Sequence, residues 1–161
     1  MTIVEVMEGL KDVLEEAVKN HETDQPSGKQ FGSSSGPVPI AVYAGFPPVR
    51  TSSKEQASFV YALVTDFEDA DEDEKMGTAT VEIGFSIYDS DTKDGWRSLF
   101  NLMEHVRQAL LAHRYINNKR CRLTLPLKGA IASEQPFPEW QGKIVAVYSI
   151  AQPEEEMNFD W

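Results

Sequence analysis

GTATVEIGFSIYD, residues Gly77–Asp89, alternates between apolar and mostly polar positions. The odd-numbered residues from Ala79 to Ile87 are all apolar, whereas Thr, Glu, Gly, Ser and Tyr occupy the even positions between Thr80 and Tyr88. A period of two predicts a β-strand with one face on a hydrophobic core and one face toward solvent. Because a single strand cannot satisfy its backbone hydrogen bonds, the sequence predicts a sheet around this segment.

Four other segments have the composition of strands. They are rich in β-branched, aromatic or leucine residues and are bounded by turn formers. The segment Phe59–Val64 is apolar at both parities, which predicts a central strand covered on both faces. The four predicted strands are Val38–Ala44, Ser58–Asp66, about Cys121 to Leu127, and Ile144–Ile150.

Two segments have helical periodicity. In residues 2–19, apolar side chains recur every three or four positions, and Thr2 is a candidate N-cap. A second helix is predicted to begin after Ser90–Thr92, which offers N-cap candidates, and to end at about His113. Both helices should bury one face against the sheet.

The second predicted helix has a wide apolar stripe, which Trp96 and Phe100 extend, so we expect these two aromatic side chains to be buried. The element order is α-β-β-β-α-β-β. Consecutive strands with one intervening helix predict an α+β fold, with a mostly antiparallel or mixed sheet of about five strands and two main helices on one face.

The domain organisation follows from length and composition. A chain of 161 residues is within the range of one domain. We predict a single α+β domain over residues 1–152 that includes a mobile loop at 24–37, where Gly, Ser and Pro predominate. Residues 153–161 (PEEEMNFDW) are predicted to form an acidic C-terminal tail.

Charge and cysteine content restrict the function. The 26 acidic and 15 basic residues give a net charge of −11, which opposes sequence-independent binding to nucleic acid or anionic membranes. The single cysteine excludes an intrachain disulfide, as expected in a reducing compartment. With neither a signal peptide nor a membrane-spanning segment evident, the sequence predicts a soluble protein made in the cytoplasm.

The sequence lacks a recognisable catalytic or metal-binding pattern. His105 and His113 are eight residues apart, too far for two ligands on adjacent helical turns. The aspartates within residues 69–73 resemble the start of a calcium loop, but the Gly and Glu that such a loop requires later are missing. Cys121 shares its strand face with leucines, which predicts an inert buried thiol. We therefore predict no enzyme activity, no metal and no cofactor.

A proline-rich loop is the first candidate interaction site. Prolines exclude a helix in EQPFPEW, residues 134–140, and the two aromatic rings can anchor an interface. Alternatively, these rings close the end of the core. The candidate subunit or partner interface consists of Glu134, Gln135, Pro136, Phe137, Pro138 and Trp140.

An acidic run is the second candidate. The segment Phe67–Lys75 repels itself too strongly to pack, which predicts an exposed hairpin tip. Its simplest interpretation is a plain solvated loop. The candidate residues are Glu68, Asp69, Asp71, Glu72, Asp73 and Glu74.

Four motifs are similar to one protein family. They are DGW at 94–96, LFNLMEHVRQAL at 99–110, LTLPL at 123–127 and EQPFPEWQG at 134–142. Together they resemble the tail terminator, or tail completion, proteins of long-tailed phages and prophages. The similarity is best from about Asp89 to Ile150, and the Glu-Gln-Pro-x-Pro-x-Trp loop is its most specific part.

The resemblance implies a virion structural protein. Such proteins form a hexameric ring at the head-proximal end of the tail tube, end tail polymerisation and present a surface for head joining. The implied partners are other copies of the chain, the tail tube protein and the head–tail connector or neck proteins, while DNA passes without specific binding. In such a ring, the acidic candidate residues within 68–74 would face the lumen or the neighbouring ring. Assembly would occur in the host cytoplasm, and the protein would then reside in the virion tail.

Two alternatives remain open from the sequence. The first is a head-completion or neck protein, which shares the composition and ring formation of a tail terminator but binds the portal side. The second is a small non-viral ligand-binding domain or enzyme, which would have a concave site with perturbed titratable groups.

Overall fold

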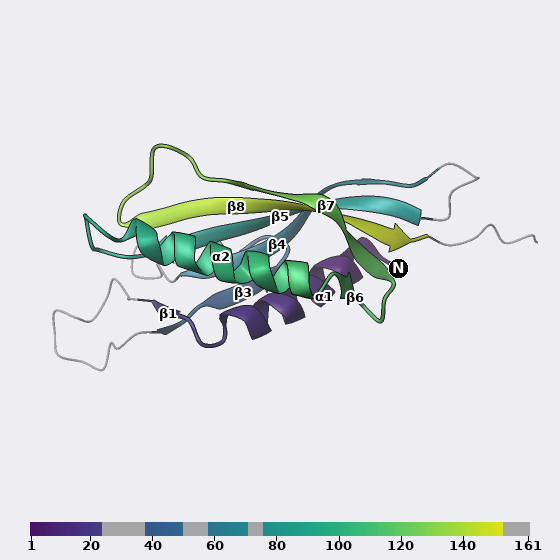
Figure 1. Cartoon of the computed structure of the whole chain (residues 1–161), viewed down its shortest axis with the longest axis horizontal. Coiled ribbons are helices and arrows are strands. Elements are labelled where there is room, and N and C mark those ends of the chain that lie inside the picture. The colour runs from purple at the N-terminus through teal and green to yellow at the C-terminus, as the bar shows by residue number, and fades with distance from the viewer. Residues whose placement is uncertain (24–37, 50–57, 71–75, 153–161) are drawn as a thin grey trace, which may run out of the picture.

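The computed structural model describes residues 1–23, 38–49, 58–70 and 76–152. It contains two long helices and a curled sheet (Figure 1). The predicted loop at 24–37 and the predicted tail at 153–161 lie outside the described residues. The elements are α1 (Ile3–Val18), β1 (Glu22–Thr23), β2 (Val38–Pro39), β3 (Ala41–Ala44), β4 (Phe59–Glu68), β5 (Met76–Tyr88), α2 (Trp96–Ala112), β6 (Tyr115–Ile116), β7 (Cys121–Ala130) and β8 (Glu139–Ala151).

The main sheet has the strand order β3-β4-β5-β8-β7-β6. Strands β3 and β4 are parallel, and the other neighbours are antiparallel. The predicted α+β fold with a mixed sheet and two helices is therefore confirmed. The sheet has six strands instead of about five, because β6 has two residues and gives no periodic signal. Strands β1 and β2 form a separate antiparallel pair.

The core lies between one face of the sheet and both helices, which Figure 1 shows on the same side of the sheet. The odd-numbered residues of β5 from Ala79 to Ile87 are all buried, as their alternation predicts. The helices contribute Leu10 and Leu14 from α1 and Leu99 and Leu102 from α2. Burial of such side chains stabilises the fold by about 1.5–3 kcal/mol each.

Helix α1 begins as predicted, with Thr2 as its N-cap. The Glu5 backbone N–H donates to the Thr2 hydroxyl at 3.1 Å, and the Thr2 backbone N–H donates to the Glu5 carboxylate at 2.6 Å. This capping box satisfies two N–H groups that the first turn leaves without helical partners. The Thr2 backbone bond also lowers the pKa of Glu5.

Helix α2 differs from the prediction at its start. Its N-cap is Gly95, which supplies no side-chain bond, and not a residue of Ser90–Thr92. The Asp91 carboxylate instead accepts bonds from the backbone N–H groups of Lys93 and Asp94, at 2.9 and 3.1 Å. Because these bonds form a turn before the helix, Asp91 is not available as the cap.

Helix α2 also buries a narrower face than predicted. Trp96 and Phe100 are 40% and 47% exposed, so the expectation that they are buried is wrong. The buried stripe consists of Leu99, Leu102, Met103, Val106 and Leu110. The two aromatic rings lie beside this stripe, where the sheet does not cover them.

Two strand predictions need correction. The predicted strand Val38–Ala44 divides into β2 and β3, which pair with different strands, because Pro39 has no N–H to continue a ladder. Among the described residues, strand β4 is fully covered on one face only. Val60 and Ala62 are buried, but Phe59 and Tyr61 on the opposite face are only half-buried.

The two tyrosines Tyr148 and Tyr61 provide a test of the core. The fully buried Tyr148 hydroxyl has no hydrogen-bond partner among the described residues, and burial raises its pKa. Since a buried unsatisfied hydroxyl costs about 1–3 kcal/mol, Tyr148→Phe should maintain or increase the free energy of unfolding. Tyr61→Phe is the matched control: it removes a bond to Glu82 and should cost about 1 kcal/mol. Urea denaturation measures both, and a large loss in Tyr148→Phe would contradict the assignment.

A second prediction concerns His21, whose ring packs against His105 of α2 with centroids 4.8 Å apart. Burial, and secondly the charge of His105, lower the pKa of His21 from 6.5. As the pH falls, His21 of the unfolded chain therefore binds a proton before His21 of the folded protein does. The neutral, half-buried His21 ring thus contributes its full stability above about pH 6.5, and this stability is lost as the pH falls further. From about pH 7.5 to about pH 5.5, His21→Gln should lose less stability than the wild type. His113→Gln, which replaces an exposed histidine, should behave like the wild type.

Candidate interaction surfaces

One glutamine side chain holds together the loop at 134–140. The Gln135 side-chain amide donates to the carbonyls of Ala132 and Gln141, at 2.8 and 3.0 Å. Its carbonyl oxygen accepts from the backbone N–H of Gln141 at 2.6 Å. These three bonds join the two ends of the loop, so its conformation is fixed by its own side chain.

The same loop is fastened to the segment before α2. The Trp140 indole N–H donates to the Asp89 carbonyl, and the Asp89 backbone N–H donates to the Pro138 carbonyl, both at 3.0 Å. The Asp89 carboxylate also accepts from the Ser98 hydroxyl at 2.6 Å. The loop is therefore a rigid extension of the sheet and α2.

The two aromatic residues of the loop have different environments. Trp140 is half-buried and packs against the core, so it closes the end of the core. Phe137 is 48% exposed and meets Trp140 edge to face, with ring centroids 6.1 Å apart. Glu134 and Pro136 are also exposed, whereas Gln135 and Pro138 are half-buried. Of the candidate residues, Phe137 is the large apolar side chain that the loop presents outward.

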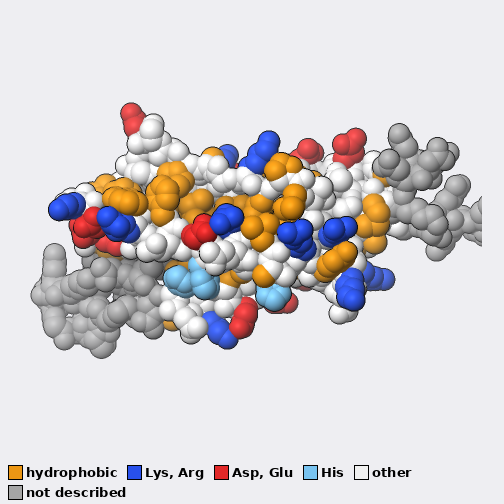
Figure 2. Space-filling model, in the orientation of Figure 1, with side chains coloured by type: hydrophobic (Ala, Val, Ile, Leu, Met, Phe, Trp, Pro, Cys, Tyr) orange, Lys and Arg blue, Asp and Glu red, His pale blue; other side chains and the backbone are white. Residues whose placement is uncertain are grey.

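Phe137 is at the same end of the molecule as other exposed apolar side chains. Trp96 and Phe100 pack edge to face at the start of α2, with centroids 5.5 Å apart. Phe100 and the exposed Ile131 line a hollow of about 160 Å³ between α2 and β7. We name Trp96, Phe100, Ile131 and Phe137 the α2 strip. Figure 2 shows hydrophobic side chains gathered along α2 and the strands beside it.

The acidic candidate surface lies at the other end of the sheet. Glu68 ends β4 and Asp69 follows it, and both are exposed. Asp71, Glu72, Asp73 and Glu74 lie outside the described residues. Strand β5 runs for 13 residues from this hairpin to Tyr88, which pairs with Glu139. At about 3.3 Å per residue, the two candidate surfaces are ~40 Å apart, so the structure does not bring them together.

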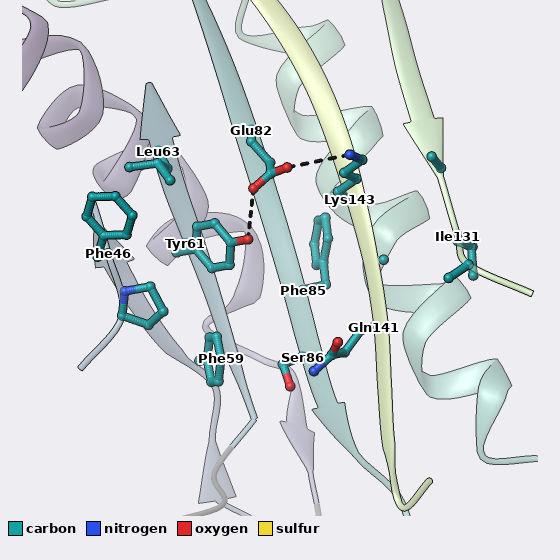
Figure 3. Close-up of a pocket in the computed structure, with 14 residues that line it drawn as sticks. Phe46, Phe59, Tyr61, Leu63, Glu82, Phe85, Ser86, Ile131, Gln141 and Lys143 are labelled. Atoms are coloured by element: carbon teal, nitrogen blue, oxygen red, sulfur yellow. Dashed lines mark hydrogen bonds and ion pairs between the residues drawn. The ribbon is translucent and has the colours of Figure 1, made fainter. Parts of the chain in front are cut away.

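A third surface was missed by sequence reasoning. The sheet face opposite the helices carries a groove of about 760 Å³ (Figure 3). Phe59, Tyr61 and Leu63 of β4 line one side, while Phe46 and Ile131 lie at opposite margins. The signal for this surface in the sequence was that β4 has apolar residues at both odd and even positions. The sequence analysis interpreted them as burial under a second layer, whereas the described residues leave this face open.

Polar side chains also line the groove, among them Ser86, Gln141 and one bonded group of three residues. The Tyr61 hydroxyl donates to Glu82 at 3.0 Å, and the Lys143 ammonium is 3.6 Å from the same carboxylate. Burial, and then the bond to Glu82, raise the pKa of Tyr61 to about 12. The Tyr61 ring lies over Gly84, where a Cβ atom would be 2.1 Å from the ring. A glycine at this position therefore leaves the space that the ring occupies.

The other residues considered for chemistry are the cysteine and the possible metal ligands. Cys121 is buried as predicted, and burial raises the pKa of its thiol to about 12. Within residues 1–23, 38–49, 58–70 and 76–152, no three His, Cys, Asp or Glu side chains are placed to hold a metal ion. Among the described helices, none is long and apolar enough to cross a membrane.

Similarity to known proteins is found among solved structures. No family model matches the sequence, and no curated protein matches it. A solved chain from the "Virion of native gene transfer agent (GTA) particle" is similar over 94% of this chain and 98% of its own length. The sequence identity is 15% and the TM-score is 0.40. At this TM-score, the similarity supports no conclusion about the function of this chain.

Gly95 tests the attachment of the loop to α2. A Cβ atom at Gly95 would be 2.5 Å from the Asp91 carbonyl oxygen and 2.8 Å from the Trp140 indole nitrogen. Because the first contact is with backbone, Gly95→Ala should destabilise the protein by about 1–3 kcal/mol in thermal unfolding. Gly129→Ala is the control, since the nearest atom to its Cβ would be at an ordinary 3.8 Å. Equal stability of the two variants would contradict this prediction, because it would show that the loop adjusts to the added methyl group at no cost.

Proposed function

We propose that this chain is a structural subunit of a phage-type virion and that it acts as a tail terminator. Copies would form a ring, hexameric by the resemblance described above, at the head-proximal end of the tail tube. The ring would stop tail polymerisation and provide the surface that joins the head. This function is structural and requires no catalysis.

The arrangement of two different surfaces at opposite ends of one sheet best supports this proposal. A ring needs heterologous contacts, in which one patch of each subunit meets a different patch of the next. The α2 strip lies at one end of β5, and the acidic hairpin with Glu68 and Asp69 lies at the other. A subunit whose sheet holds two different surfaces apart can make the same contact with each neighbour around a closed ring.

The α2 strip also supports assembly on energetic grounds. Phe137, Phe100 and Trp96 are large rings, each about half exposed and close to rigid elements. Aromatic side chains that protrude from a preformed surface are typical anchors of protein interfaces, because little entropy is lost when they are covered. In the proposed ring, a neighbouring subunit covers this strip.

The charge of the chain suits a ring through which DNA moves. A lumen with many cations would bind phosphates, whereas the net charge of −11 permits a repulsive lining. Glu68 and Asp69 are exposed at the hairpin end, where they can face the lumen or the adjacent ring of the tail tube. Their neutralisation should leave the fold intact and slow DNA passage.

Light scattering over a concentration series, with negative-stain microscopy of any large species, tests the proposal. The wild type should form closed rings at high concentration. Phe137→Ser should weaken ring formation at least about tenfold, since loss of a hot-spot side chain costs about 2 kcal/mol or more. Val49→Ser is the matched control, because Val49 is 90% exposed and lies outside the α2 strip.

A capping assay then distinguishes the tail from the neck. Purified protein is mixed with growing tail tubes and, separately, with portal complexes. A tail terminator should stop tube growth and be retained on tube ends, and Phe137→Ser should reduce both effects. Retention on the portal complex alone would identify a neck protein, and activity toward neither would contradict the proposal.

A further inference from the structure

The open sheet face has a concave groove that the described residues leave uncovered. Its floor is formed by β4, β5 and β8, and Phe46 and Ile131 lie at its two margins (Figure 3). The Phe46 side chain is 81% exposed. An apolar segment that lies between these two margins would cover the floor. A volume of about 760 Å³ fits a few large side chains.

The chain itself contains a segment with the required pattern. In residues 156–161, EMNFDW, apolar and polar residues alternate, so Met157, Phe159 and Trp161 would share one face of an extended strand. The other face would carry Asn158 and Asp160. Such a segment can place three large apolar side chains on the groove floor and keep its polar side chains toward solvent.

Two lysines on this sheet face are opposite in charge to the segment: Lys143 lines the groove, where it also pairs with Glu82, and Lys128 lies in the row beyond it. Lys143 pairs with Ala130 across β7 and β8, and Lys128 pairs with Val145 in the next row of the same face. These two lysines lie along one side of a face on a strongly acidic protein, and both are exposed. Residues 153–161 contain four acidic and no basic residues. Opposite charge favours docking of this segment over other parts of the acidic surface.

The segment cannot reach the groove of its own chain with all three apolar residues. Strand β8 runs from the groove toward Gln152, and Lys143 lies nine residues before Gln152, or ~30 Å at about 3.3 Å per residue. Met157 lies five residues beyond Gln152 and so extends at most ~17 Å. A tail from a neighbouring copy does not have this restriction.

We propose that residues 153–161 of one copy bind in the open-face groove of a neighbouring copy, with Met157, Phe159 and Trp161 against Tyr61 and Leu63. This inference rests on the proposed function, because the contact needs neighbouring copies. It adds a second link between subunits beside the α2 strip, with which the groove shares Ile131. Each subunit then offers one groove and one tail, which satisfies the closure of a ring.

A peptide-binding experiment tests the contact directly. The protein is the full chain with Met157, Phe159 and Trp161 all changed to Ser, which leaves its groove free. A fluorescein-labelled peptide of residues 153–161 is titrated into it, and fluorescence anisotropy is recorded. Saturable binding is expected, and a peptide with Asn158→Ser and Asp160→Ser should still bind.

Groove variants give the specificity of this binding. In the same background, Phe46→Ser should weaken peptide binding at least about tenfold. Val49→Ser should leave it unchanged, because Val49 is an exposed apolar residue three positions away that does not line the groove. Since both side chains are exposed, neither change should unfold the protein. Absence of binding, or equal binding by both variants, would overturn the proposal.

Ring formation separates this inference from the proposed function. If the triple-serine chain forms rings and caps tubes like the wild type, the tail contact is refuted while the terminator function stands. If the peptide binds the groove but the wild type caps no tubes, the tail contact stands and the terminator function is refuted. Loss of rings in Phe46→Ser but not in the triple-serine chain would show that another part of the neighbour fills the groove, and would overturn the tail proposal.

Discussion

The pairing of β5 on both of its edges is the constraint on which the rest of the structure depends. All 13 residues of β5 pair with β8, and most of them also pair with β4. At the same time, the odd-numbered side chains from Ala79 to Ile87 are buried beneath the helices. With both edges and one face of β5 occupied, Glu68 at the end of β4 and the proline-rich loop beside Tyr88 are held at opposite ends of the sheet.

This architecture has two layers, which leaves one sheet face without a helical cover among the described residues. An exposed antiparallel face is ordinarily polar. Here Phe59, Tyr61 and Leu63 make it apolar along β4, and a bonded group of Tyr61, Glu82 and Lys143 crosses its floor. Apolar surface that a fold leaves uncovered is typical of a protein that completes its packing by association. The groove and the α2 strip therefore support the same conclusion from different faces.

Assembly by an acidic chain must overcome repulsion between copies. With a net charge of −11, like-charged subunits approach only where apolar contact or local cations compensate. The α2 strip supplies apolar contact, and the groove combines apolar contact with one lysine, Lys143. Both proposed contacts are thus placed where the acidic surface is interrupted.

The sequence by itself determined the features that depend on local periodicity. The alternation in Gly77–Asp89 specifies β5. The helical spacing in residues 2–19, together with the cap at Thr2, specifies α1, so the α+β class was predictable. Only the tertiary structure decided which apolar residues are exposed. Trp96 and Phe59 have the same apolar character as buried residues, and their exposure depends on whether another layer reaches them, which no local pattern records. The bonds of Gln135 and the separation of the two candidate surfaces likewise depend on strand pairing across the sheet.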